Sequence, residues 1–154
     1  DRIAVHCCDG LDFLQKSGGK GYDLILVDAF DDHGMAPTIY AAPFFKLCSA
    51  SLKHGGVVSC NLWSSDAPHY QAMQTILADF FAASLYCPVP ERGNIVALAM
   101  QQAVPWSKIT LKKKEYAKLS GHYGIDFKKL ATVVKTNNLS LSQQFRNLLG
   151  GGGK

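Results

Sequence analysis

The chain has 154 residues, which is long enough for one domain with a sizeable core, and 47% of them are hydrophobic while 18% are charged. This balance excludes an intrinsically disordered chain, and no apolar run approaches the ~20 residues that a membrane span requires. The first ten residues, DRIAVHCCDG, lack the basic segment and apolar core of a signal peptide, so we expect neither a leader nor a membrane partner.

Apolar runs and glycine- or proline-containing breaks alternate along residues 1–103. In chain order they predict a strand at 3–8, a helix at 11–16, a strand at 23–27, a helix at 42–54, a strand at 57–63, a helix at 67–84 and a strand at 94–101. Strands that alternate with helices and read as continuous apolar runs indicate an α/β fold with a mostly parallel sheet covered on both faces.

The charge is unevenly distributed, although the net value is only +4. Residues 1–103 carry six Lys or Arg and ten Asp or Glu, whereas residues 104–154 carry ten and two. This shift predicts a boundary near AVPWSK, with a basic and mainly helical extension over 104–154. Short helices are expected at 111–120, 125–135 and 140–149. A lysine-rich face is usually solvated or contacts another subunit, so we do not expect nucleic acid as a partner.

The five cysteines form no CxxC pair and no spacing typical of zinc ligands, and three of them fall in apolar stretches that predict buried strands. They are expected to behave as small hydrophobic residues in a reducing compartment, which indicates a cytoplasmic protein. The five histidines are scattered, and no metal site is predicted from them.

Polar residues follow each of the first three predicted strands. Asp9 and Gly10 come after the first strand, Asp28 and Asp31 after the second, and Asn61 lies at the end of the third. Because the carboxyl ends of parallel strands meet at one edge of a sheet, these residues are expected to share one cleft. The alternative is that they cap the helices that follow, a position that Asp and Asn also favour.

Four segments, IAVHCCDGLDFL, YDLILVDAFDDHGMAP, APFFKLCSASLKHGGVVSCNLW and RGNIVALAM, together resemble the spermidine synthase family of aminopropyltransferases. The resemblance covers residues 2–100 in unbroken order. It implies a Rossmann-like fold of the class I S-adenosylmethionine-dependent methyltransferase type, with a final antiparallel strand. It also implies an enzyme, a transferase of the EC 2.5.1 type, that is a homo-oligomer such as a dimer and moves an aminopropyl group from decarboxylated S-adenosylmethionine to putrescine or a related amine.

The resemblance also implies a role for each of five residues. Asp9 is expected to bind the adenine amino group, with Gly10 permitting close approach. Asp28 is expected to be the catalytic aspartate, Asp31 to hold an amine of the substrate, and Asn61 to lie near that amine. The co-substrate would be decarboxylated or ordinary S-adenosylmethionine, and no prosthetic group is implied.

The chemistry of the residues fits an amine acceptor independently. An alkylamine is protonated at pH 7 but attacks only when neutral, so the site must remove a proton, and a carboxylate can accept it. Asp32 and Pro90 depart from the family's usual residues, which leaves the identity of the amine open. No glycine-rich loop is followed by a helix in the usual context, so we expect the chain to be the C-terminal part of a longer domain.

Three functions from different classes therefore remain open at this point. The first is an aminopropyltransferase, the second is a class I methyltransferase of unknown substrate, and the third is a non-catalytic fragment or interaction module whose working surface is the basic tail.

Overall fold

A computed structural model describes residues 2–19, 21–32, 34–105 and 111–150, with residues 139–150 as backbone only. Its elements are, in chain order, α1 (Gly10–Lys16), β1 (Tyr22–Val27), β2 (Phe30–Asp31), β3 (Gly34–Met35), α2 (Ala42–Ser51), β4 (Leu52–Trp63), α3 (Ala67–Phe80), β5 (Ala83–Pro88), β6 (Asn94–Met100), α5 (Lys113–Tyr123) and α6 (Phe127–Gly150). The described residues contain no helix that is both long and apolar enough to cross a membrane.

Four strands form the central sheet in the order β1-β4-β6-β5, and β2 and β3 form a separate short hairpin. β1 and β4 are parallel, whereas β6 runs antiparallel to both β4 and β5. The predicted α/β sheet with a final antiparallel strand is therefore confirmed.

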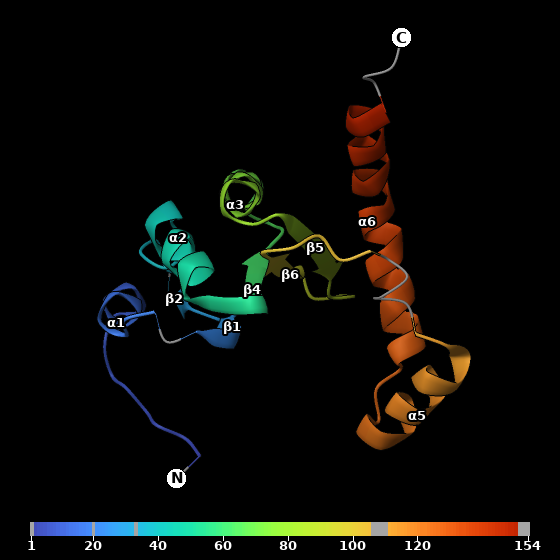
Figure 1. Cartoon of the computed structure of the whole chain (residues 1–154), viewed down its shortest axis with the longest axis horizontal. Coiled ribbons are helices and arrows are strands. Elements are labelled where there is room, and N and C mark those ends of the chain that lie inside the picture. The colour runs from blue at the N-terminus through green and yellow to red at the C-terminus, as the bar shows by residue number, and fades with distance from the viewer. Residues whose placement is uncertain (1, 20, 33, 106–110, 151–154) are drawn as a thin grey trace.

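Helices α2 and α3 lie on the same side of this sheet (Figure 1). The connections β1–α2–β4 and β4–α3–β5 both step in the same direction across the sheet, so right-handed crossovers place both helices on one face. The side chains beneath them form the buried core, which includes Phe45, Val58, Cys60, Leu62 and Leu77.

The prediction that helices cover both faces of the sheet is wrong for the described residues. Among the residues that the structure describes, no helix lies on the second face, and Leu24 and Leu26 of β1 are 53% and 71% exposed there. β1 is also an edge strand within the described part of the chain, where β4 is its one hydrogen-bonded neighbour.

The predicted strand at residues 3–8 is also wrong in this structure. The segment contains no helix or strand, and Ile3 and Val5 are 81% and 89% exposed. A strand requires a hydrogen-bonded neighbour, and β1, the available edge, pairs only with β4 among the described residues. Cys7 and Cys8 are consequently exposed rather than buried.

Three other predicted boundaries differ. Helix α2 ends at Ser51, and β4 begins directly at Leu52. Within β4, a side chain added at Gly56 would lie 2.8 Å from the carbonyl oxygen of Tyr22, so the backbones of β4 and β1 approach closely there. Helix α3 ends at Phe80, and the following ASLYCP forms β5 rather than the end of a helix. The two helices expected at 125–135 and 140–149 are one continuous helix, α6.

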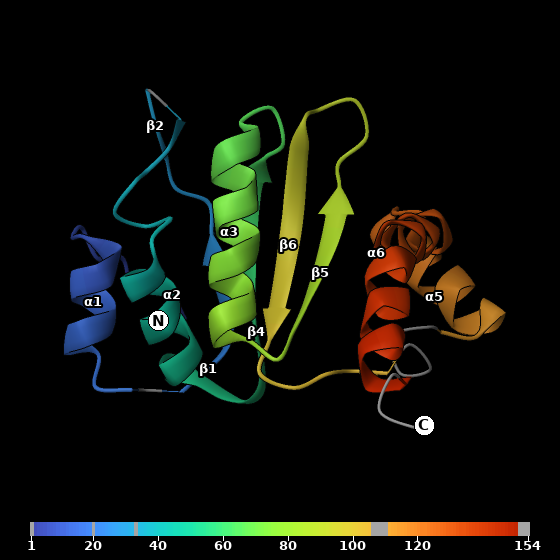
Figure 2. The same ribbon diagram turned by 90° about the horizontal axis from the view of Figure 1, so that it is seen from above.

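Helix α6 packs against β5 at the edge of the sheet, and α5 packs against α6 (Figure 2). Asn138 of α6 is 2% exposed and binds the backbone of Tyr86 twice: its Nδ2 donates to the Tyr86 carbonyl oxygen, and its Oδ1 accepts from the Tyr86 N–H, each at 2.8 Å. One side chain thus satisfies two backbone groups of β5 that another strand would otherwise bind. The predicted boundary near residue 103 stays a prediction, and part of it, residues 106–110, lies outside the described residues.

Candidate active site

Asp28 and Asn61 lie at the same edge of the sheet because β1 and β4 are parallel neighbours. Val27, the last residue of β1, pairs with Cys60 of β4. The next residue after each of them is therefore at the same level of the sheet: Asp28 directly follows β1, and Asn61 lies near the carboxyl end of β4. Asn61 Nδ2 donates a hydrogen bond to Asp28 Oδ1 at 3.1 Å. The structure therefore brings these two predicted site residues into contact.

Both residues line a pocket of about 380 Å³ on the face of the sheet that carries no helix among the described residues. Its lining is Leu26, Val27, Asp28, Ser59, Asn61, Val89, Arg92, Asn94 and Val96. The walls combine aliphatic side chains from β1, β6 and the loop between β5 and β6 with a few polar groups, a composition typical of small-molecule sites. One carboxylate and one guanidinium supply its charge.

Asn94 was missed by sequence reasoning although it contacts this site directly. Its Nδ2 donates to Asn61 Oδ1 at 3.0 Å, and it is the first residue of β6. The strand-end rule examines the carboxyl ends of parallel strands, whereas an antiparallel strand brings its amino end to the same edge. Arg92, in the loop between β5 and β6, was missed for the same reason. The final antiparallel strand, which the sequence did predict, could have indicated both.

Asp31 lines a different pocket, of about 360 Å³, and the other residues that line this pocket include Asp66, His69 and Tyr40. Asp31 Oδ1 accepts a hydrogen bond from the backbone N–H of Gly34 at 3.0 Å, which closes the turn between β2 and β3. His69 Nδ1 lies 2.5 Å from Asp66 Oδ2. Asp28 and Asp31 therefore line two different pockets, although the two aspartates are close in sequence.

An aromatic cluster supports the acidic hairpin. The ring of Phe30 lies 5.1 Å from that of Trp63 and 6.1 Å from that of Tyr40, measured between centroids. The Tyr40 hydroxyl donates to the backbone carbonyl oxygen of Asn61 at 2.8 Å. Burial, with a smaller contribution from the nearby charge of Asp28, raises the pKa of Tyr40 to about 12. Tyr40 therefore stays protonated near neutral pH and keeps β4 and the hairpin linked.

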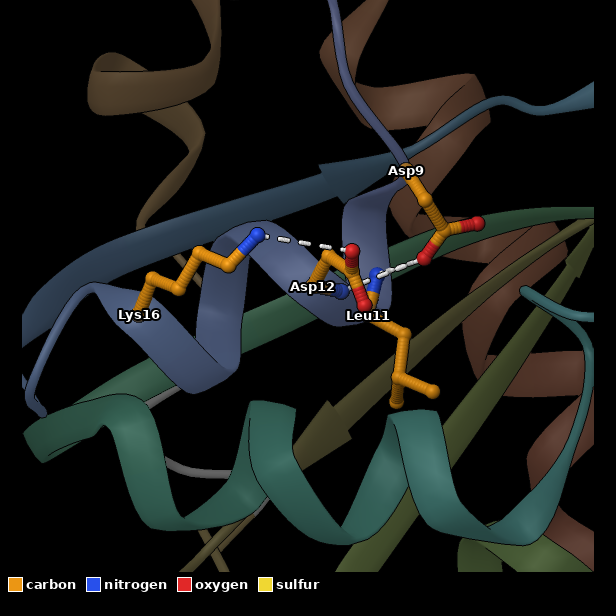
Figure 3. Close-up of polar contacts among 4 residues, drawn as sticks. All are labelled: Asp9, Leu11, Asp12 and Lys16. Atoms are coloured by element: carbon orange, nitrogen blue, oxygen red, sulfur yellow. Dashed lines mark hydrogen bonds and ion pairs between the residues drawn. The ribbon is translucent and has the colours of Figure 1, made fainter.

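Asp9 caps helix α1 in this structure. Its Oδ1 accepts hydrogen bonds from the backbone N–H groups of Leu11 and Asp12, at 2.8 and 3.1 Å, while its second oxygen points away from the helix (Figure 3). Lys16 forms an ion pair with Asp12 one turn further on, at 3.5 Å. The alternative that Asp9 caps the following helix therefore holds for one of its two carboxylate oxygens, Oδ1.

Gly10 has a packing reason to lack a side chain. A Cβ at this position would lie 3.0 Å from Ile39 Cδ1 and 3.4 Å from the ring of Phe44. Neither Asp9 nor Gly10 is in the lining of the pockets that hold Asp28 and Asp31. The roles predicted for these two residues stay predictions.

Metal ligation was not predicted, and the described residues contain no group of three or more His, Cys, Asp or Glu side chains that could hold an ion.

Comparison with solved structures identifies the fold first. The chain matches human methyltransferase-like protein 13 in complex with SAH, with a TM-score of 0.62 and 21% identity over 79% of this chain and 57% of that one. It matches a spermidine synthase in complex with the transition state analogue AdoDATO equally well, with a TM-score of 0.62 and 17% identity over 76% of this chain and 42% of that one. The fold is therefore the Rossmann-like fold of methyltransferases and spermidine synthases.

Sequence comparison then identifies the family. The family model for the spermine/spermidine synthase domain matches residues 1–113, and the chain belongs to this family. It is 30% identical over 145 residues to the polyamine aminopropyltransferase of Neisseria meningitidis serogroup A, which covers 94% of this chain and 55% of that protein. It is 35% identical over 77 residues to the spermine synthase of Arabidopsis thaliana, covering 50% of this chain and 21% of that protein. The chain thus spans about half, or less, of the length of these relatives.

Proposed function

We propose that the protein is a transferase that moves an aminopropyl group from decarboxylated S-adenosylmethionine to putrescine or a related amine. The observation that carries the proposal is the contact of Asp28 with Asn61 inside a pocket at the carboxyl ends of β1 and β4. Family membership and relatives named polyamine aminopropyltransferase support the same reaction.

In the proposed reaction, the amine nitrogen attacks the propyl carbon that is bound to the sulfonium. The new C–N bond forms as the C–S bond breaks, and the bonding pair passes to sulfur, so the leaving group is a neutral thioether. Asp28 accepts the proton that the amine loses, and Asn61 holds the carboxylate in place. No oxyanion develops, so positioning supplies most of the rate enhancement.

The remaining predicted residues take binding roles in this proposal. The carboxylate oxygen of Asp9 that points away from α1 would accept a hydrogen bond from the adenine amino group, with Gly10 beside it. Asp31 would attract the distant ammonium group of a diamine from its own pocket. We also propose that the protein works as a homo-oligomer in the cytoplasm, where the buried Cys48, Cys60 and Cys87 stay reduced.

A methyltransferase activity is the second candidate, favoured by one observation. Arg92 lines the Asp28 pocket, and a guanidinium pairs well with a carboxylate such as the one that ordinary S-adenosylmethionine keeps and the decarboxylated form lacks. The fold is equally compatible with this function, since the matched human structure is a methyltransferase-like protein.

The deciding experiment is an assay of the intact protein with decarboxylated and ordinary S-adenosylmethionine against a panel of mono-, di- and triamines. The proposal expects aminopropyl transfer with the decarboxylated form and at least one diamine. Methyl transfer from ordinary S-adenosylmethionine, with no aminopropyl product, would favour the second candidate and contradict the first.

A further inference from the structure

A chain of three side chains enters the Asp28 pocket from β6. Asn94 Nδ2 donates to Asn61 Oδ1 at 3.0 Å, and Asn61 Nδ2 donates to Asp28 Oδ1 at 3.1 Å. All three residues line the same pocket. The proposed function uses Asp28 and Asn61, and it leaves Asn94 without a role.

The chemistry of the three groups fixes the direction of these hydrogen bonds. An ionised carboxylate only accepts, so Asn61 must turn its NH₂ group toward Asp28. Its carbonyl oxygen then points the other way and requires a donor, which the NH₂ group of Asn94 supplies. Asn94 and Asp28 therefore favour the same orientation of the Asn61 amide, one by donating to its oxygen and the other by accepting from its NH₂ group.

The backbone holds Asn94 at this place independently of its side chain. Asn94 pairs with Trp63 in the β4–β6 ladder, and its carbonyl oxygen accepts from the N–H of Val89 at 2.8 Å. Asn61 pairs with Val96, so Asn61 and Asn94 are diagonal neighbours on one face of the sheet. A change of the Asn94 side chain should leave these backbone contacts in place.

We propose that Asn94 is a positioning residue that acts through Asn61 to hold the carboxylate of Asp28 in one orientation toward the reacting amine. The inference rests on the proposed function, in which Asp28 accepts the proton of that amine. Without the Asn94 donor, the Asn61 oxygen loses its hydrogen bond, so the amide that contacts Asp28 is held from one side only and the carboxylate is less firmly oriented.

The test compares kinetics of four forms of the intact protein: wild type, Asn94→Leu, Asn61→Leu and the double variant. Asn94→Leu is expected to lower kcat by roughly 10- to 100-fold, the order of loss for a catalytic group that is displaced by about 1 Å, with little change in the KM of the nucleoside substrate. In the Asn61→Leu background the same change should have little further effect, because the residue through which Asn94 acts is gone.

Asn94→Asp provides a second variant of nearly the same shape. Its carboxylate attracts the NH₂ group of Asn61 and turns the carbonyl oxygen toward Asp28, so kcat should fall at least as far as in Asn94→Leu. Asn137→Ala is the matched control, since Asn137 is an exposed asparagine of α6 whose Nδ2 donates to the Val133 carbonyl oxygen of its own helix. Its kinetics should equal those of wild type.

Two results would overturn the inference. One is a kcat for Asn94→Leu or Asn94→Asp equal to wild type, and the other is an equal loss in the presence and absence of Asn61. The side-chain amide NMR signals of Asn61 supply a readout that needs no activity, and they should shift in Asn94→Leu but not in Asn137→Ala. If the wild type transfers no aminopropyl group, the proposed function fails, and these signals still decide whether Asn94 orients Asn61.

Discussion

Asp28 is the single residue on which the proposed chemistry depends most. Asp28→Asn keeps the shape of the side chain and can still contact Asn61, but an amide cannot accept the proton of the amine. We expect kcat of the intact protein to fall by roughly two to four orders of magnitude, the usual range for the loss of a general base, with nucleoside binding little changed. Steady-state kinetics and calorimetric titration of the nucleoside would measure the two effects.

Asp31→Asn serves as the comparison at the same scale. It removes a charge from the second pocket and should mainly raise the KM of the amine, because that charge contributes to binding rather than to proton transfer. Near-normal turnover of Asp28→Asn with every amine would contradict the assignment of the base.

Buried ionisable side chains predict how stability depends on pH. Burial raises the pKa of the Cys48 and Cys60 thiols from 9.0 to about 12. A raised pKa means that the folded state binds the proton more tightly than the unfolded state, so the contribution is complete below pH 9 and is lost as pH rises toward 12. Thermal unfolding should therefore occur at a lower temperature at pH 10.5 than at pH 8. An equal decline in a Cys48→Ala, Cys60→Ala double variant would assign the effect to other groups, such as Tyr86, whose pKa is also raised to about 12 by burial.

At the scale of elements, the contact between α6 and β5 includes two hydrogen bonds from one buried side chain, Asn138. Asn138→Ala would leave the buried N–H and carbonyl oxygen of Tyr86 without their hydrogen bonds to Asn138, and we expect the free energy of unfolding to fall by about 2–4 kcal/mol. Chemical denaturation would measure the change. Asn137→Ala, one residue away and exposed, should stay within about 0.5 kcal/mol of wild type. Similar values for the two variants would show that Asn138 does not hold the helix.

The elements also show which sequence signals were sufficient. β1, β6, the part of β4 from residue 57 onward and the first turn of α2 followed from apolar runs and from Pro43, because these signals are local, whereas residues 52–54 of β4 were predicted as the end of a helix. β5 was missed because its first two residues were predicted as the end of a helix, and the short segment that follows is not assigned by periodicity alone. The segment at residues 3–8 has the composition of a strand, but composition does not supply a neighbour. In the same way, Asp28 and Asn61 followed from the rule for strand ends, whereas Asn94 required the register of β6.

At the scale of the whole molecule, one face and one edge of the sheet are open among the described residues. Leu24 and Leu26 are exposed on the strand β1, whose outer edge has no partner there. Edge strands with apolar side chains tend to pair with a second copy, so we expect this chain to associate in solution as its concentration rises. Light scattering over a range of concentrations would detect this.

Two matched variants test this expectation: one places a charge on β1, and the other places the same charge on α6. Leu26→Lys should shift association to higher concentration, whereas Leu130→Lys, at a 46% exposed position on α6, should not. A monodisperse monomer at every concentration would contradict the expectation.

The diagonal pairing of Asn61 with Asn94 links catalysis to the accuracy of folding. Side chains alternate between the two faces of a strand, so a slip of β6 by one residue would turn Asn94 toward the core and Ile95 toward the pocket. Such a molecule would retain its secondary structure and much of its compactness, yet Asn61 would lose its donor. The specific activity would therefore report the fraction of molecules in which β6 pairs in its native register. Circular dichroism would not detect a shift of this register, because the secondary structure is retained.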